Sequence, residues 1–97
     1  MEQIDQETSK QLYARRLKER LEQLGISQYA LLKKLRDLGD DGATTASLSY
    51  YCSGTHFPGD QRRSYIAEAL STPRLYFICE DDHEAKEILK KSVTKWK

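Results

Sequence analysis

The chain has 97 residues, enough for about one domain, and its 16 Lys and Arg nearly balance its 15 Asp and Glu, giving a formal net charge of +1. No apolar run approaches the roughly 18 residues that a membrane span needs, and residues 1–5 do not resemble the start of a signal peptide. Two cysteines cannot build a disulfide-rich framework. We therefore expect a cytoplasmic protein that does not interact with membranes.

Helical periodicity and capping residues predict short helices along the chain in order. The first spans residues 8–24 and stops at Gly25, and the second spans 28–38 with Ser27 as its N-cap. After a turn at residues 40–42, Thr44 or Thr45 caps a third helix that closes at residues 53–54.

Asp60 is the predicted N-cap of a fourth helix that reaches Leu70, after a turn at residues 58–60. Residues 75–78 could form a helical turn or a short strand, and we favour a helical turn because no other segment offers a strand partner. Asp81 or Asp82 caps a last helix that continues to Trp96. The predicted fold is all-α, a compact bundle of five to six short helices.

Charged residues are distributed unevenly. Residues 10–36 hold eight basic and two acidic residues, whereas the only charged residues of 37–60 are acidic. Separate patches of opposite sign suit a protein that meets a polyanion with one face, although an ordinary solvated surface produces the same pattern. Charge therefore permits nucleic-acid binding without requiring it.

The predicted helices at 28–38 and 44–53 have the arrangement of a helix-turn-helix. A helix enters the major groove of DNA only if its leading residues allow close approach. Small residues with hydroxyl or methyl groups lead the second helix of this pair: Thr44, Thr45, Ala46, Ser47 and Ser49. Hydroxyls can bond base edges or phosphates, and methyls can contact thymine. Two short helices with a turn also occur in bundles that bind no DNA.

Residues 17–73 resemble the Cro/phage-repressor (XRE-like, lambda-repressor-like) helix-turn-helix family. The matching stretches are LKERL at 17–21, ISQYAL at 26–31, TASLSYYCSG at 45–54, Pro58, and IAEAL at 66–70. The resemblance implies that Gln28 contacts a DNA phosphate, that Leu48 and Tyr51 face the core, and that other residues face the DNA. Those residues are Thr45, Ala46, Ser49 and Tyr50 on the recognition helix, with Arg62 and Arg63 at the start of the fourth helix as phosphate contacts.

The chain departs from the family pattern in the turn before the recognition helix. This turn is about three residues longer than usual, and the excess is Asp40, Asp41 and Gly42. Since acids that faced the phosphates would repel them, we expect the turn to point away from DNA. The family's long polar side chains early in the recognition helix are also absent, which leaves more of the readout to Tyr50, to DNA shape and to basic residues.

The tyrosines are expected to serve two purposes. Tyr50 lies beside Tyr51 on the same helix and should therefore be exposed. The others are expected in the core or at its edge: Tyr13, Tyr29, Tyr51, Tyr65 and Tyr76.

We divide the chain into a helix-turn-helix DNA-binding domain at 1–74 and a C-terminal helical dimerisation extension at 75–97. One helix-turn-helix covers too little DNA for tight specific binding, so two copies are expected to pair across a pseudo-palindrome. The predicted dimerisation residues are apolar and lie in the extension: Phe77, Ile88, Leu89, Val93 and Trp96.

Two Cys and two His with a repeated spacing are a conceivable zinc set: Cys52, His56, Cys79 and His83. Zinc sites usually pair Cys with Cys and His with His, whereas each pair here is mixed, so we predict no metal and no cofactor. Paired carboxylates, a phosphate-binding glycine loop and a nucleophile constellation are all lacking from the sequence, and we expect no enzymatic activity.

Together these patterns predict a sequence-specific transcriptional regulator that binds double-stranded DNA as a homodimer in the bacterial cytoplasm or nucleoid. We expect a repressor that occupies a pseudo-palindromic operator. The alternative is an antitoxin or adaptor whose helical domain binds a partner protein. The near-neutral net charge favours that alternative, because many DNA-binding domains are clearly basic.

Overall fold

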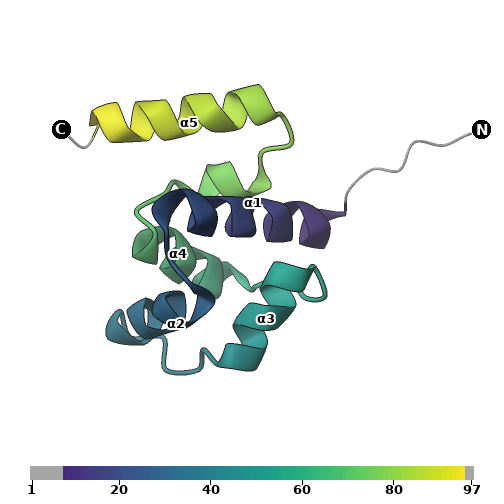
Figure 1. Cartoon of the computed structure of the whole chain (residues 1–97), viewed down its shortest axis with the longest axis vertical. Coiled ribbons are helices and arrows are strands. Elements are labelled where there is room, and N and C mark those ends of the chain that lie inside the picture. Colours follow the sequence, from purple (N-terminus) through teal and green to yellow (C-terminus); the bar gives the residue numbers. More distant parts are fainter. Residues whose placement is uncertain (1–7, 96–97) are drawn as a thin grey trace, which may run out of the picture.

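The structure, a computed structural model, describes residues 8–95, with the backbone alone for residues 92–95. These residues form five α-helices and one 3-10 helix and no strand, which confirms the all-α prediction (Figure 1). The helices are α1 (Ser9–Leu24), α2 (Gln28–Asp37), α3 (Thr45–Ser53), α4 (Asp60–Ala69), the 3-10 helix η1 (Arg74–Ile78) and α5 (Asp82–Lys95). Within the part of the chain that is described, no helix combines the length and the apolar character needed to cross a bilayer.

The first three helices begin and end within one residue of the predicted boundaries. Ser27 caps α2 by accepting a hydrogen bond from the Ala30 amide at 3.0 Å, and Thr44 caps α3 in the same way. α1 ends at Gly25, whose φ of +69° lies in the left-handed region that favours glycine. Local capping chemistry therefore fixes the helix boundaries on both sides of the α1–α2 turn and at the start of α3.

The predicted N-cap of α4 is wrong by one residue. Gly59 occupies the N-cap position and Asp60 is already the first helical residue. The Asp60 carboxylate instead accepts a hydrogen bond from Arg74 at 2.6 Å, so its acceptor is directed toward η1 rather than toward the amides of its own helix. Farther along, Asp81 is the residue that caps α5, because its Oδ1 accepts from the amides of His83 at 2.8 Å and Glu84 at 3.1 Å.

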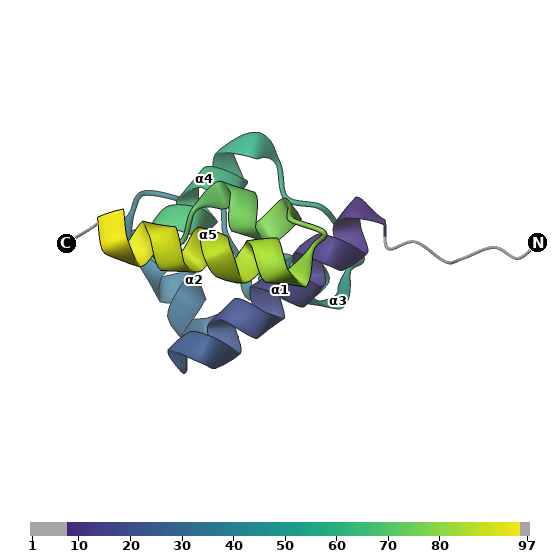
Figure 2. The ribbon, with the colours of Figure 1, turned by 90° about the horizontal axis from the view of Figure 1, so that it is seen from above.

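α1 lies in the middle of the fold. Figure 1 shows α2 and α3 on one side of it and η1 and α5 on the other, and Figure 2, the view from above, shows α5 lying in front of the other helices. Apolar side chains from all the helices form a single core, which includes Leu17, Leu31, Leu48, Ile66, Tyr76 and Ala85. Residues of the predicted C-terminal extension thus share the core with the helix-turn-helix segment.

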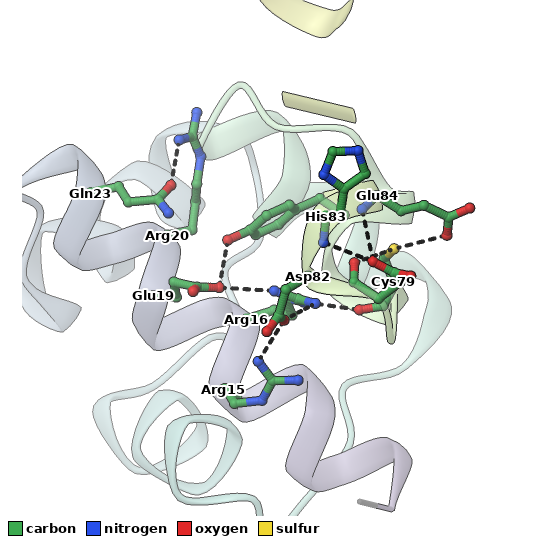
Figure 3. A network of polar contacts seen from close by, with 11 residues as sticks. Arg15, Arg16, Glu19, Arg20, Gln23, Cys79, Asp82, His83 and Glu84 are labelled. Carbon is green, nitrogen blue, oxygen red and sulfur yellow. Dashed lines mark hydrogen bonds and ion pairs between the residues drawn. The ribbon is translucent and has the colours of Figure 1, made fainter. Parts of the chain in front are cut away.

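A network of polar contacts centred on Arg16 attaches the start of α5 to α1 (Figure 3). Arg16 is only 1% exposed. Its Nε donates to the Cys79 carbonyl at 2.9 Å, and its Nη2 pairs with Asp82 at the same distance. The Arg16 guanidinium also lies 5.5 Å from the centre of the Tyr76 ring. The chain between η1 and α5 is therefore held by a buried cation rather than by apolar packing alone.

This network predicts a pH dependence of stability. Hydrogen bonds from Arg15 and Arg16 lower the pKa of Asp82 below its usual 3.8. A lowered folded-state pKa means that the ionised carboxylate contributes stability above pH 3.8 and that this contribution is lost as the pH falls through the folded-state value. We expect urea unfolding between pH 6 and pH 2 to show a smaller loss of stability for Asp82→Asn than for the wild type. The exposed neighbour Glu80→Gln is the control and should follow the wild type. Parallel pH curves for Asp82→Asn and the wild type would contradict this role of Asp82.

Candidate nucleic-acid interface

The recognition-helix candidate α3 has two distinct faces. Leu48 and Tyr51 are buried against the core, as predicted, and Tyr50 is exposed, also as predicted. The outer face carries only small side chains besides Tyr50, and its exposed members are Thr45, Ala46 and Ser49. Because Thr45, Ala46 and Ser49 are neither charged nor long, the α3 backbone can approach another surface closely at these positions.

Two hydroxyls that were predicted to contact DNA also hold the start of α3. Thr44 Oγ1 accepts a hydrogen bond from the Ser47 amide at 3.0 Å and shares another with the Ser47 hydroxyl at 2.9 Å. Ser47 is half-buried by this arrangement. Thr44 is therefore the N-cap of α3 and also engages the Ser47 hydroxyl, while Thr45 and Ser49 carry further exposed hydroxyls on the outer face.

His56 adds an aromatic contact to this face that the sequence did not indicate. The rings of Tyr50 and His56 meet edge to face with centroids 4.6 Å apart. The Tyr50 carbonyl also accepts from the amide of His56 at 3.3 Å. The loop after α3 thus folds back on Tyr50 and supports its ring from one side. A helical wheel cannot show this contact, because Gly54 reverses the chain between the two residues.

The start of α2 contributes a second exposed polar element. Gln28, the first residue of α2, is exposed, in keeping with its predicted contact with phosphate. Tyr29 is 69% exposed, so its predicted place in the core is wrong. The inward face of this ten-residue helix is filled by three leucines, Leu31, Leu32 and Leu35, which leaves position 29 on the solvent side.

Basic residues border α3 on two sides. Arg36, on α2, donates from Nη2 to the Ala43 carbonyl at 3.1 Å, directly before α3 begins. Lys18, on α1, is exposed, and its charge lies close enough to Cys52 to oppose the rise that burial causes in the pKa of that thiol. Sequence reasoning found neither residue individually, because its signal was only the excess of basic residues over 10–36.

The acidic turn before α3 is partly neutralised inside the protein. Asp40 is buried, and its carboxylate pairs with the Arg62 guanidinium, including a contact of 3.1 Å between Nη2 and Oδ1. Arg62 Nη1 also donates to the Tyr51 hydroxyl at 3.0 Å. Burial opposes the charge of Arg62, but its hydrogen bond to the Asp40 carboxylate and the nearby Tyr51 outweigh that effect, so the pKa of Arg62 is raised.

The two arginines at the start of α4 are therefore occupied within the protein. Arg62 joins the α2–α3 turn to α4 through its ion pair with Asp40. Arg63 is half-buried, and its guanidinium lies 4.9 Å from the centre of the Phe57 ring and 3.5 Å from Asp60. The sequence showed the position of both charges but not their partners, which apart from Asp60 lie outside α4.

The predicted dimerisation residues fall into three groups. Phe77 is 1% exposed and stacks on Tyr13 with ring centroids 5.3 Å apart, so its assignment to a dimer contact is wrong. Ile88 and Leu89 are half-buried and pack against the core. Val93 and Trp96 lie outside the residues whose side chains the structure describes.

The conceivable zinc ligands do not converge. Among the described residues, no group of three or more His, Cys, Asp or Glu side chains could hold a metal ion. Cys52 and Cys79 are both buried free thiols, and His56 contacts Tyr50 instead.

Comparisons with protein-family models, with curated proteins and with solved structures give no match. The resemblance to the phage-repressor family consequently rests on residues 17–73 themselves.

Proposed function

We propose that this protein is a DNA-binding module that inserts α3 into the major groove. The observation that carries the proposal is the outer face of α3, which is exposed, small and uncharged. Nine helical residues span about 13 Å at 1.5 Å per residue, a length comparable to the roughly 12 Å width of the major groove. A helix of this kind needs no rearrangement to reach base edges.

The exposed residues suggest a division of contacts. The hydroxyls of Thr45 and Ser49 can bond base edges, and the Ala46 methyl can contact a thymine methyl. Gln28 lies at the start of α2, where free backbone amides and the helix dipole favour a phosphate. Lys18 and Arg36 supply positive charge beside α3. Asp40 does not oppose this arrangement, because its charge is paired with Arg62.

More particularly, we propose a transcriptional repressor that acts as a homodimer on a pseudo-palindromic operator. One copy of α3 contacts only a few base pairs, so a second copy about 34 Å away, one turn of DNA, would be needed for specificity. Occupancy of a promoter by such a dimer would block polymerase.

Selection of the purified chain on a random duplex library, at two salt concentrations, tests this function. We expect an enriched two-fold symmetric site and binding that weakens steeply as salt rises, because phosphate contacts release counterions. No enrichment and no binding at low salt would contradict the proposal and would favour the alternative of a module that binds a partner protein.

The substitution Ala46→Glu tests the proposed face directly. We expect it to weaken binding to the selected site at least about 100-fold, since a bidentate base contact alone is worth roughly 1–3 kcal/mol and the new carboxylate also faces the phosphates. Folding should be unaffected, because Ala46 is exposed and an acid in the first turn suits the helix dipole. Gel-shift titration gives the affinity.

The matched control is Lys86→Glu on α5. Lys86 is exposed, and its helix, α5, lies on the other side of α1 from α3 (Figure 1). This change alters the net charge by more than Ala46→Glu does. We expect near-wild-type affinity. An equal loss in both variants would mean that overall charge, rather than the face of α3, controls binding.

A further inference from the structure

The short helix η1 presents two large apolar side chains to solvent. Leu75 and Ile78 are 58% and 45% exposed, whereas Tyr76 and Phe77 between them are buried. Residues three apart eclipse one another in a 3-10 helix, so Leu75 and Ile78 form one continuous ridge along η1. Contact with an apolar partner would remove this ridge from water, which is favourable.

A cavity of about 250 Å³ adjoins the ridge. Leu75 and Ile78 line it together with Tyr13, Arg63 and Arg74. A pocket of roughly 150 Å³ can hold a benzene molecule, so this cavity has room for an aliphatic side chain. A ridge beside a cavity is a self-complementary shape, because each of two copies can place its ridge against the cavity of the other.

Charges of opposite sign stand at the two ends of the ridge. Arg74 Nη2, at the start of η1, donates to Asp60 at 2.6 Å, and Arg63 reaches the same oxygen at 3.5 Å. One carboxylate is thus shared by two guanidiniums, which leaves this end with an excess positive charge. Beyond the other end of η1, Glu80 and Asp81 are both exposed. The surface along η1 therefore runs from basic through apolar to acidic.

A surface with this order pairs with itself when two copies meet antiparallel across a two-fold axis. The basic end of one copy then faces the acidic end of the other, and the same contact is repeated at the opposite end, as in any isologous interface. A parallel arrangement would place like charges together. Charge complementarity mainly determines which partner is accepted, and the partner that fits this order is the same chain.

Three residues that the sequence predicted for dimerisation contact the core instead. Phe77 stacks on Tyr13, and Ile88 and Leu89 pack against the core from α5. The ridge lies in the same C-terminal extension, and its side chains are turned away from the core. It can therefore contact a second copy without any rearrangement of the fold.

We propose that the ridge of Leu75 and Ile78, with Arg74 and Glu80 at its ends, is the surface through which two copies of this chain associate. The two ridges lie antiparallel, and each packs against the cavity of the other copy. This proposal rests on the homodimer of the proposed function and names its surface. Because small interfaces are weak, the dimer dissociates readily in solution and is reinforced when both copies bind adjacent half-sites.

Sedimentation equilibrium of the full chain without DNA measures this association, at concentrations up to about 1 mM because small interfaces are weak. We expect monomer and dimer and no larger species, since a two-fold interface is closed. Leu75→Ser should weaken association at least about 10-fold, because it removes apolar burial twice in each dimer. The control is Leu24→Ser at the end of α1, which changes another exposed leucine and should associate like the wild type.

Two outcomes of this measurement would overturn the proposal. A wild type that stays monomeric would leave the ridge to a different protein. A Leu75→Ser variant that associates as well as the wild type would place the dimer contact elsewhere on the chain.

Charge reversal tests the antiparallel pairing. Arg74→Glu alone and Glu80→Arg alone each bring like charges together at both ends of the homodimer, so each variant should associate at least about 10-fold more weakly. An equimolar mixture of the two variants should recover nearly wild-type association, because each copy then presents the charge that the other lacks. Both positions are exposed, so circular dichroism should show both variants folded. A mixture that associates no better than the separate variants would overturn the pairing of two copies in this order.

Self-association and DNA binding can fail separately. A monomeric chain that still enriches a duplex from the random library would overturn this surface and leave the DNA-binding function standing. A dimer that responds to these substitutions but enriches no duplex would support the surface and contradict the DNA-binding function.

Discussion

Replacing Asp40 by Ala is expected to destabilise the protein by about 3 kcal/mol, the lower end of the range for breaking a buried ion pair. The loss arises because Arg62 keeps its charge but has no anion, and its guanidinium is held against Tyr51 by the fold. The lower end applies because Arg62 is half-buried and can recover some hydration. A domain of this size is stable by only about 5–15 kcal/mol, so the effect is a large fraction of the total.

Urea unfolding followed by circular dichroism measures this loss, and a double-mutant cycle separates its causes. Asp40→Ala combined with Arg62→Met removes the stranded charge, so we expect the double variant to regain most of the lost stability. Asp40→Asn should fall between the wild type and Asp40→Ala, because an amide still accepts a hydrogen bond. If the double variant were as unstable as Asp40→Ala, the cost would come from lost packing and not from the unpaired charge.

Arg16→Met is expected to cost about 2–3 kcal/mol. The substitution keeps an unbranched apolar side chain but removes the donor to the Cys79 carbonyl, and an unsatisfied buried acceptor costs roughly 1–3 kcal/mol. The two acids that Arg16 contacts add less, since Glu19 is partly exposed and Asp82 largely so. Hydrogen exchange should rise first in η1 and at the start of α5, while α2 and α3 keep their protection.

Arg15→Met is the matched control for this prediction. Arg15 also pairs with Asp82, at 3.2 Å, but its side chain is 39% exposed. An exposed pair of this kind contributes about 0–1 kcal/mol, so the variant should unfold close to the wild type. Equal destabilisation by the two substitutions would show that the hydrogen bond from Arg16 to the buried Cys79 carbonyl is not the main source of the lost stability.

Local signals in the sequence predicted most of the helix boundaries. Ser27, Thr44 and Gly25 act within one helical turn of their own position, so each could be read without knowledge of the fold. The exposure of Tyr50 and the burial of Tyr51 likewise follow from helical geometry alone. The N-cap of α4 was predicted one residue too late, at Asp60. This error has a nonlocal cause, because the Asp60 carboxylate accepts a hydrogen bond from Arg74 on η1.

Side-chain partners that are distant in sequence escaped prediction for the same reason. Asp40 and Arg62 are 22 residues apart, and nothing local to either residue indicates the pair. Phe77 was placed at a dimer contact because a five-residue helix has too little periodicity to define an inward face. Arg16 is different: it lies three residues after Tyr13 and four after Leu12, on the apolar face of α1, so a buried arginine was foreseeable from spacing.

The separation of structural and outward residues on α3 has an evolutionary consequence. Leu48, Tyr51 and the caps at both ends hold the helix in place, whereas Thr45, Ala46 and Ser49 face solvent and take no part in the core. Substitutions at these three positions carry little penalty for folding, as is usual for surface sites. Chains that share this scaffold can therefore diverge at the outer face of α3 faster than their architecture changes, and each new combination presents a different chemical surface on the same support.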